Sequence, residues 1–261
     1  MTSAAPPALT ATGVTVAVDS RLLVDGLDLE LRAGEIVALL GMNGAGKTLL
    51  LHTLAGLRPP RDGTVRLLDA DIATLGRRDI ATRLAVLPQD SDDVFPASVL
   101  ETVLVGRHPH VERFGWETRR DIALAREALA AVALDELGDR NVLTLSGGER
   151  QRLAIAQCLT QDAPVMLLDE PTNHLDPHHQ LDGLELFRAQ ANGGKAVLMT
   201  LHDVNFAARY ADRCLLLFGD GRWQLGPTDD ILSEETLEKL YGVAMEMLPW
   251  KGRNVFMPAI S

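Results

Sequence analysis

Short runs of apolar residues recur along the chain, each bounded by glycine, proline or charged residues: Ile36–Leu40, Ala85–Leu87, Val165–Leu168, Ala196–Leu201 and Cys214–Phe218. Such runs are typical of strands that are buried on both faces. Stretches of helical periodicity lie between them: Asp121–Leu134, Gly148–Leu159 and Leu181–Ala191. Strands that alternate with helices predict an α/β fold with a largely parallel sheet.

Residues 90–160 interrupt this alternation. They begin with an acidic stretch that holds Asp90, Asp92 and Asp93, and they continue with helical patterns only. We therefore expect a helical subdomain inserted into the α/β core. Further along, the turn Gly219–Gly221 followed by Arg222–Leu225 predicts a hairpin. The Ala- and Pro-rich residues 1–12 predict a frayed tail.

Charge and composition exclude several classes of protein. The 25 Lys and Arg against 36 Asp and Glu give a net charge of −11, which argues against nucleic acid as the main partner. No run approaches the ~20 apolar residues of a membrane-spanning helix, and residues 1–12 lack the pattern of a signal peptide. Cys158 and Cys214 lie far apart in apolar stretches, which favours reduced core thiols and a cytoplasmic protein.

A phosphate-binding pattern follows the first apolar run. Residues 41–48 match G-x-x-x-x-G-K-[ST], and a predicted helix over residues 49–57 follows them. The glycines let successive backbone N–H groups face one anion, and the helix start adds partial positive charge. Lys47 would reach the β- and γ-phosphates, and the Thr48 hydroxyl would hold Mg²⁺. The predicted nucleotide-binding residues are Gly41, Met42, Asn43, Gly44, Ala45, Gly46, Lys47 and Thr48.

The apolar run Val165–Leu168 ends in two carboxylates, Asp169 and Glu170. A buried strand that ends in Asp is where a P-loop enzyme places its Mg²⁺-coordinating group, and we assign this role to Asp169. Glu170 is then placed to orient or deprotonate the attacking water. A solvated acidic loop is the alternative, and the P-loop upstream argues against it.

A third motif, Leu145–Glu149, precedes the helix that carries Arg150, Gln151 and Arg152. Ser146 can cap this helix, and Gly147 and Gly148 allow another group to approach closely. The chain thus holds a second anion-binding helix start.

The P-loop, Leu145–Gln151 and Asp169-Glu170, in this order, resemble the ATP-binding cassette (ABC) ATPases. The resemblance implies a glutamine loop at Gln89, a dimer-crossing loop at Asn173–Asp176 and a γ-phosphate histidine at His202. It also implies a head-to-tail homodimer in which each ATP lies between the P-loop of one copy and the Ser146-Gly147-Gly148 helix start of the other. The residues that would bind ATP in trans are Ser146, Gly147, Gly148 and Asp176. Catalysis is assigned to Glu170, His202 and Gln89, and Mg²⁺ coordination to Thr48, Gln89 and Asp169.

The same resemblance implies a P-loop, RecA-like core with a mostly parallel sheet, an N-terminal antiparallel β portion and the inserted helical subdomain. One ABC domain would span residues 13–240, with its core at 13–89 and 161–240 and the helical subdomain at 90–160. Residues 1–12 would be the tail, and residues 241–261 a C-terminal extension.

Longer strings are similar to the importers of iron–siderophore, haem and cobalamin within this family: Gly106–His110, Asn173–Asp176 followed by His179-Gln180, and Leu201–Asn205 followed by Ala208–Asp212. This resemblance implies an ATPase on the cytoplasmic side of the plasma membrane that powers a separate permease. The helical subdomain would contact the permease, and a periplasmic binding protein would take part indirectly. Trp116 would be an anchor for a partner helix or a subdomain core residue.

A soluble ABC protein acting on ribosomes or in iron–sulfur assembly is the alternative function. Ribosomal ABC proteins usually hold two cassettes in one chain, and Gly106–His110 fits the iron–sulfur branch poorly. A P-loop kinase would lack the Ser146 helix start and the glutamate beside Asp169. The chain departs from the family in three places. The expected strand Val14–Val18 has no adenine-stacking aromatic, and Val18 is near its usual position, so the resemblance does not extend to recognition of the base. Leu49 stands where a second hydroxyl residue is frequent, and Met42 stands where proline is common.

Overall fold

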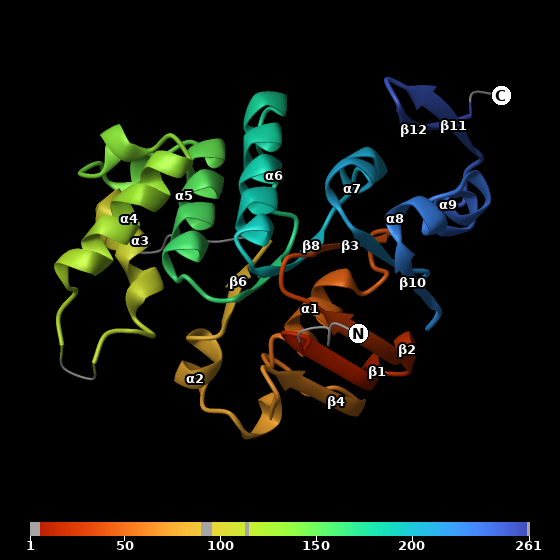
Figure 1. Cartoon of the computed structure of the whole chain (residues 1–261), viewed down its shortest axis with the longest axis horizontal. Helices are drawn as coiled ribbons and strands as arrows, with labels where there is room; N and C mark the ends of the chain where they lie inside the picture. Colours follow the sequence, from red (N-terminus) through yellow and green to blue (C-terminus); the bar gives the residue numbers. More distant parts are fainter. Residues whose placement is uncertain (1–5, 90–95, 113–114, 260–261) are drawn as a thin grey trace, which may run out of the picture.

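A six-stranded sheet forms the centre of the computed structural model, which describes residues 6–89, 96–112 and 115–259 (Figure 1). In spatial order its strands are β10 (Trp223–Pro227), β9 (Arg213–Leu217), β3 (Ile36–Gly41), β8 (Ala196–Thr200), β7 (Val165–Leu168) and β6 (Leu84–Leu87). All pairs are parallel except β10 with β9. The predicted α/β fold is confirmed, and the five apolar runs form strands whose ends differ from the prediction by at most one residue.

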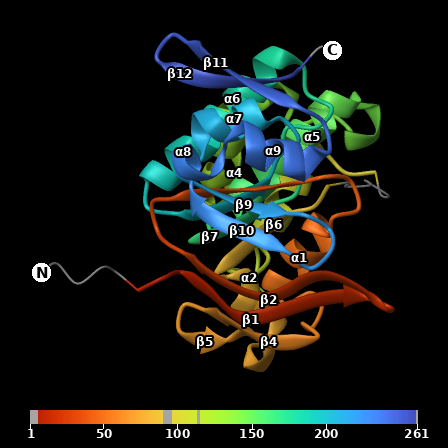
Figure 2. The ribbon, with the colours of Figure 1, turned by 90° about the vertical axis from the view of Figure 1, so that its right-hand side faces the viewer.

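A second, antiparallel sheet contains β2 (Arg21–Leu31), β1 (Leu9–Val18), β4 (Asp62–Leu67) and β5 (Ala70–Asp71) (Figure 2). This confirms the antiparallel β portion, but the predicted tail over residues 1–12 is wrong from Leu9 onwards. Leu9 pairs with Leu31 on β2 and with Leu67 on β4, and it is fully buried. These partners are distant in the sequence, so local composition does not reveal the strand.

The central sheet separates two apolar cores, because successive side chains of a strand point to opposite faces. On β3, Val37 and Leu39 join a core with the antiparallel sheet and helix α1 (Lys47–Leu54). Ile36, Ala38 and Leu40 join the other core, with the helices that cover the opposite face. Burial on both faces explains the continuous apolar runs in the sequence.

Every described element between β6 and β7 is helical: α3 (Val99–Leu104), η2 (Val105–Arg107), α4 (Arg119–Ala131), η3 (Asp135–Leu137), η4 (Val142–Thr144) and α5 (Gly147–Thr160). Before β6 lie η1 (Ile72–Thr74) and α2 (Arg77–Ala81). Helices α3, α4 and α5 pack together at one end of the molecule (Figure 1). Trp116 is 88% exposed, so it is not a core residue. The acidic stretch Asp90–Asp93 lies outside the described residues.

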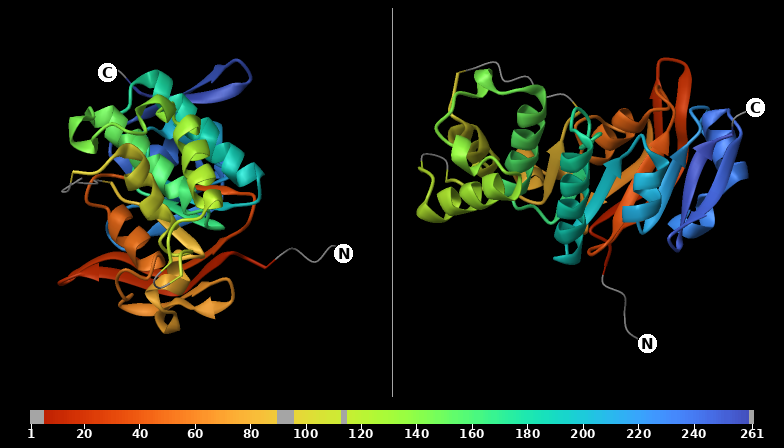
Figure 3. Two further views of the ribbon diagram at one scale, coloured as in Figure 1. Left: turned by 90° about the vertical axis from the view of Figure 1, so that its left-hand side faces the viewer. Right: turned by 90° about the horizontal axis from the view of Figure 1, so that it is seen from above.

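The remaining elements follow β7: α6 (Pro177–Asn192), α7 (Val204–Tyr210), α8 (Thr228–Ile231), α9 (Glu234–Tyr241), β11 (Met245–Trp250) and β12 (Arg253–Pro258). The predicted hairpin after Gly219–Gly221 is the pair of β9 and β10. Strands β11 and β12 form a further hairpin, which lies at the opposite end of the molecule from α3–α5 (Figure 3). Within the described residues, no helix combines the length and the apolar character needed to span a bilayer.

A buried ion pair holds the helical part together. Arg107 Nε donates to Asp121 Oδ1 at 2.8 Å, and Arg107 Nη1 donates to the Thr160 carbonyl at 2.9 Å, so η2, α4 and the end of α5 are joined. The preceding Gly106 lies so close to α5 that a Cβ atom would meet the Gln157 carbonyl at 2.4 Å. These contacts give the Gly106-Arg107 sequence a structural role.

Replacing Asp121 with Ala leaves the buried Arg107 guanidinium without its carboxylate, and we expect a loss of about 3 kcal/mol in unfolding free energy at pH 7. Hydrogen bonds from Thr118, and the Arg107 charge, lower the Asp121 pKa from 3.8 to about 2 against the effect of burial. The stabilisation is therefore complete above pH 3.8 and is lost as the pH falls towards 2. Urea denaturation at several pH values measures both effects. Asp182→Ala, which removes an exposed carboxylate, should change stability by less than about 0.5 kcal/mol.

Candidate nucleotide site

The P-loop connects β3 to α1 at the carboxyl edge of the central sheet. Gly46 takes φ = 102° at the N-cap of α1, a left-handed conformation that glycine adopts without strain. The next residue, Lys47, is only 5% exposed, and its Nζ donates to the carbonyls of Gly41 (2.9 Å) and Met42 (3.3 Å). Burial lowers the Lys47 pKa, and the charges of Glu170 and Asp169 partly oppose this shift. The cation is therefore held inside the loop where an anion would bind.

The Asp169 carboxylate is fully buried at the end of β7. Its Oδ1 accepts a hydrogen bond from the Thr200 hydroxyl at 2.7 Å, and the Glu170 N–H donates to the same hydroxyl oxygen at 2.6 Å. Asp169 Oδ2 is buried and has no hydrogen-bond partner among the described residues. An unsatisfied buried carboxylate oxygen next to a P-loop fits a divalent cation. Sequence reasoning missed Thr200, whose only signal is a hydroxyl at the end of the apolar run.

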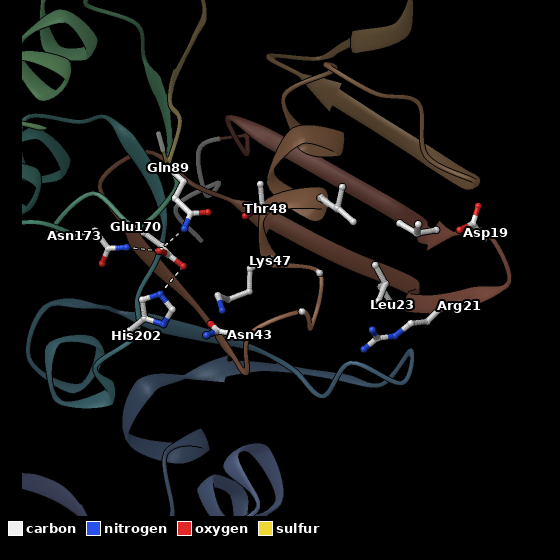
Figure 4. Close-up of a pocket in the computed structure, with 14 residues that line it drawn as sticks. Asp19, Arg21, Leu23, Asn43, Lys47, Thr48, Gln89, Glu170, Asn173 and His202 are labelled. Carbon is white, nitrogen blue, oxygen red and sulfur yellow. Dashed lines mark hydrogen bonds and ion pairs between the residues drawn. The ribbon is translucent and has the colours of Figure 1, made fainter. Parts of the chain in front are cut away.

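Three side chains surround the Glu170 carboxylate (Figure 4). Gln89 Nε2 donates to Oε2 at 3.0 Å, the Asn173 amide donates to the same oxygen, and His202 Nε2 lies 2.5 Å from Oε1. Glu170 is itself 6% exposed and has φ = 49°, a conformation rare for a residue with a side chain. The predicted catalytic residues Glu170, His202 and Gln89 thus come together. Asn173 was predicted only as part of the dimer-crossing loop.

These groups line one end of a pocket of about 750 Å³, within the usual size range of a small-ligand site. The lining residues towards this end include Asn43, Lys47, Thr48, Gln89, Glu170, Asn173 and His202 (Figure 4), and Gly44, Gly46 and Leu49 also line the pocket. Asp19, Arg21 and Leu23 lie at the other end (Figure 4), and Val18, which precedes Asp19 in the chain, also lines the pocket. Val18, near the position where an adenine-stacking aromatic was expected, is 40% exposed, and none of the described residues that line the pocket is Phe, Tyr or Trp.

The residues predicted to bind in trans lie elsewhere on the chain. Ser146 is the N-cap of α5, where its side chain accepts from the Glu149 N–H and Glu149 bonds back to the Ser146 N–H. Asp176 is the N-cap of α6, where its Oδ1 accepts a hydrogen bond from the His179 N–H at 3.0 Å. Ser146, Gly147 and Asp176 are exposed, and none of them lines the P-loop pocket of their own chain.

The chain is similar in sequence and in fold to known proteins. Residues 24–173 match the family model described as "ABC transporter". The chain is 40% identical to the Hemin import ATP-binding protein HmuV of Streptomyces coelicolor, over 91% of this chain and 84% of that protein. It is 42% identical to the protein of the same name in Pseudomonas aeruginosa, over 91% and 94% of the two chains.

The Cobalamin import ATP-binding protein BtuD of Halobacterium salinarum is 39% identical over 89% of this chain and 58% of that protein. Among solved structures, a putative metal-chelate type ABC transporter in an inward-facing conformation superposes with a TM-score of 0.84 at 30% identity, covering 97% of this chain and 98% of that chain. The matched motifs and the assembled pocket lead to one conclusion: the chain belongs to the ABC transporter family and is an ATP-hydrolysing member of it.

Proposed function

We propose that this chain is the ATPase subunit of an importer for a metal chelate, namely haem, an iron–siderophore or cobalamin. It would act as a homodimer on the cytoplasmic side of the plasma membrane, bound to a separate permease. The observation that carries the proposal is the pocket in which the P-loop, Asp169 and Glu170 converge, in a chain similar over most of its length to haem and cobalamin import subunits. That similarity favours an importer over the ribosomal or iron–sulfur alternatives.

Magnesium coordination would fall to Asp169, Thr48 and Gln89. The free, buried Oδ2 of Asp169 supports this assignment because that oxygen lacks a protein partner in the described structure. Bound Mg²⁺ would neutralise charge on the β- and γ-phosphates. Lys47 would exchange its bonds to the Gly41 and Met42 carbonyls for bonds to phosphate oxygens.

Hydrolysis would depend on the residues around Glu170. Its carboxylate would accept a proton from the attacking water as the water oxygen bonds to the γ-phosphorus and the β–γ bridge breaks. His202, within 2.5 Å of Glu170, would contact the γ-phosphate and hold Glu170 in place. Gln89 and Asn173 donate to the other carboxylate oxygen, so at least one of these bonds would open to admit the water.

The site would be completed by a second copy of the chain. Ser146, Gly147, Gly148 and Asp176 would cover the triphosphate held by the partner's P-loop, since these residues are outside the pocket of their own chain. A two-fold axis would generate two equal composite sites. Closure on ATP and reopening after hydrolysis would move the helices of residues 90–160, which would contact the permease near the exposed Trp116.

The test is uptake into proteoliposomes that contain this chain and the permease encoded beside its gene. We expect ATP-dependent uptake of one of three probes: haemin, a ferric siderophore or cobalamin, presented with the cognate binding protein. Glu170→Gln should abolish uptake. Absence of uptake for all three, while ATP hydrolysis continues, would refute the importer assignment.

Replacing Lys47 with Ala should weaken ATP binding about 10- to 100-fold, because a charge-assisted hydrogen bond contributes about 1.5–3 kcal/mol. Equilibrium binding of a fluorescent ATP analogue measures the effect. Lys239→Ala is the control, since Lys239 is an exposed lysine paired with Glu235 on α9. Unchanged affinity of Lys47→Ala would remove Lys47 from the phosphate site.

Replacing Val18 with Tyr should strengthen ATP binding at least about fivefold, because stacking of a base on an aromatic ring contributes about 1–3 kcal/mol. The affinity for inorganic tripolyphosphate, which has no base, should remain the same. Val18→Leu serves as the control for added apolar volume. If Val18→Tyr strengthens the binding of ATP and of tripolyphosphate equally, or strengthens neither, the base binds elsewhere in the pocket.

A further inference from the structure

The histidine loop is followed by a short helix whose position depends on packing. Leu201 and Val204 are buried on either side of His202, whose side chain is 45% exposed. Helix α7 has seven residues, and its cap is Asp203, which accepts the Asn205 N–H at 2.8 Å. A helix of this length is not stable alone. The orientation of His202 therefore depends on what holds the first turn of α7.

Asn205, in that first turn, is bound by the C-terminal hairpin. Its Nδ2 donates to the Phe256 carbonyl at 3.1 Å, and its Oδ1 accepts from the Phe256 N–H at 2.8 Å. One side-chain amide thus satisfies both backbone groups of a residue at the outer edge of β12. The Phe256 side chain is 3% exposed and belongs to the same core as Val204 and Ala207.

The hairpin is also fastened at its other edge. Phe256 pairs with Met247 on β11, and the Met247 N–H donates to Glu234 of α9 at 2.7 Å. A two-stranded hairpin is only marginally stable in water. Burial of Phe256 and a clamp at each edge therefore hold the hairpin, and of the two clamps only the one at Asn205 lies on α7, three residues from His202.

We propose that Asn205 is a positioning residue for ATP hydrolysis: by fastening the first turn of α7 to β12, it holds His202 in place beside Glu170. The inference rests on the role proposed above for His202. The structure contains both contacts together: Asn205 bonds the backbone of Phe256, and His202 Nε2 lies 2.5 Å from Glu170 Oε1. A small displacement of a positioned group lowers the rate without preventing substrate from binding. The C-terminal extension thereby gains a part in the reaction although it lies outside the nucleotide pocket.

The expected result for Asn205→Ala is a fall in kcat of about tenfold with a KM for ATP within about twofold of the wild type. Asn205→Asp keeps the acceptor for the Phe256 N–H and loses the donor to the Phe256 carbonyl. Its kcat should therefore lie between those of the wild type and Asn205→Ala. This variant also serves if Asn205→Ala does not fold. The matched control is Glu234→Ala, which opens the opposite edge of the hairpin; its kcat should stay within about twofold of the wild type.

A double-mutant cycle identifies the route of the effect. In a His202→Ala background, the same substitution at Asn205 should lower kcat by less than about twofold, because the residue it positions is already absent. An equal loss in both backgrounds, an unchanged kcat in Asn205→Ala and Asn205→Asp, or an equal loss in Glu234→Ala would each overturn the proposal. If His202→Ala alone leaves kcat unchanged, the role proposed for His202 fails as well, so the two failures are distinguishable.

Discussion

Glu170→Gln is expected to lower the rate of ATP hydrolysis by about 10²- to 10⁴-fold while leaving ATP binding intact, because a positioned general base contributes a factor of this size. The amide matches the carboxylate in shape and keeps an oxygen that can accept the bonds from Gln89 and Asn173, but it cannot accept the proton of the attacking water. ATP should therefore accumulate in the closed dimer. Single-turnover hydrolysis and size-exclusion chromatography with Mg²⁺-ATP measure the two effects.

The control for this substitution is Glu235→Gln, an exposed glutamate on α9 that pairs with Lys239. Its turnover should equal that of the wild type. Turnover of Glu170→Gln within threefold of the wild type would mean that another group deprotonates the water, and the mechanism proposed here would have to be abandoned.

Ser146→Arg is expected to reduce hydrolysis by at least about 100-fold and to leave ATP binding to the P-loop of the same chain unchanged. The N-cap of α5 is exposed and outside its own pocket, so the arginine would block the partner's triphosphate and not its own. Calorimetric titration of the monomer with ATP and a steady-state assay of the dimer separate these effects. A monomer that no longer binds ATP would contradict the two-chain site.

Ser98→Arg is a matched control for this second substitution, because Ser98 caps α3 with the same reciprocal bonds to a glutamate, Glu101. Each replacement should cost about 1 kcal/mol of stability, but only Ser146→Arg should stop hydrolysis. Mixing Ser146→Arg with Lys47→Ala tests directly whether each site is shared between two chains. At an ATP concentration too low to fill the Lys47→Ala P-loop, each mixed dimer holds one working composite site, so roughly a quarter of the wild-type activity should return from two proteins that are each nearly inactive under this condition.

The features that the sequence predicted are those encoded in consecutive residues. The strand Val165–Leu168 is apolar throughout because both of its faces are buried, and Asp169 and Glu170 follow it directly. The P-loop is likewise one uninterrupted pattern between β3 and α1. Parallel strands present their carboxyl ends at a single edge of the sheet, which brings the P-loop, Asp169 and His202 together.

The features that the sequence did not predict depend on distant partners. Leu9 forms a strand only through its pairing with Leu31 and Leu67, and its Ala- and Pro-rich surroundings predict a tail. Thr200, at the end of β8, bonds both the Asp169 carboxylate and the Glu170 N–H, which follow the neighbouring strand β7. Asn205 reaches Phe256, 51 residues further along the chain. No local pattern identifies which of many polar side chains makes such a contact.

The backbone of Glu170 has a consequence for the evolution of this protein. A left-handed φ of 49° at a residue with a side chain costs on the order of 1 kcal/mol, and a glycine would relieve that cost. A glycine would also remove the only carboxylate that the chain places among Gln89, Asn173 and His202 in the described structure. Selection for thermal robustness and selection for turnover therefore favour different residues at position 170, and a glutamate persists there only while hydrolysis is under selection.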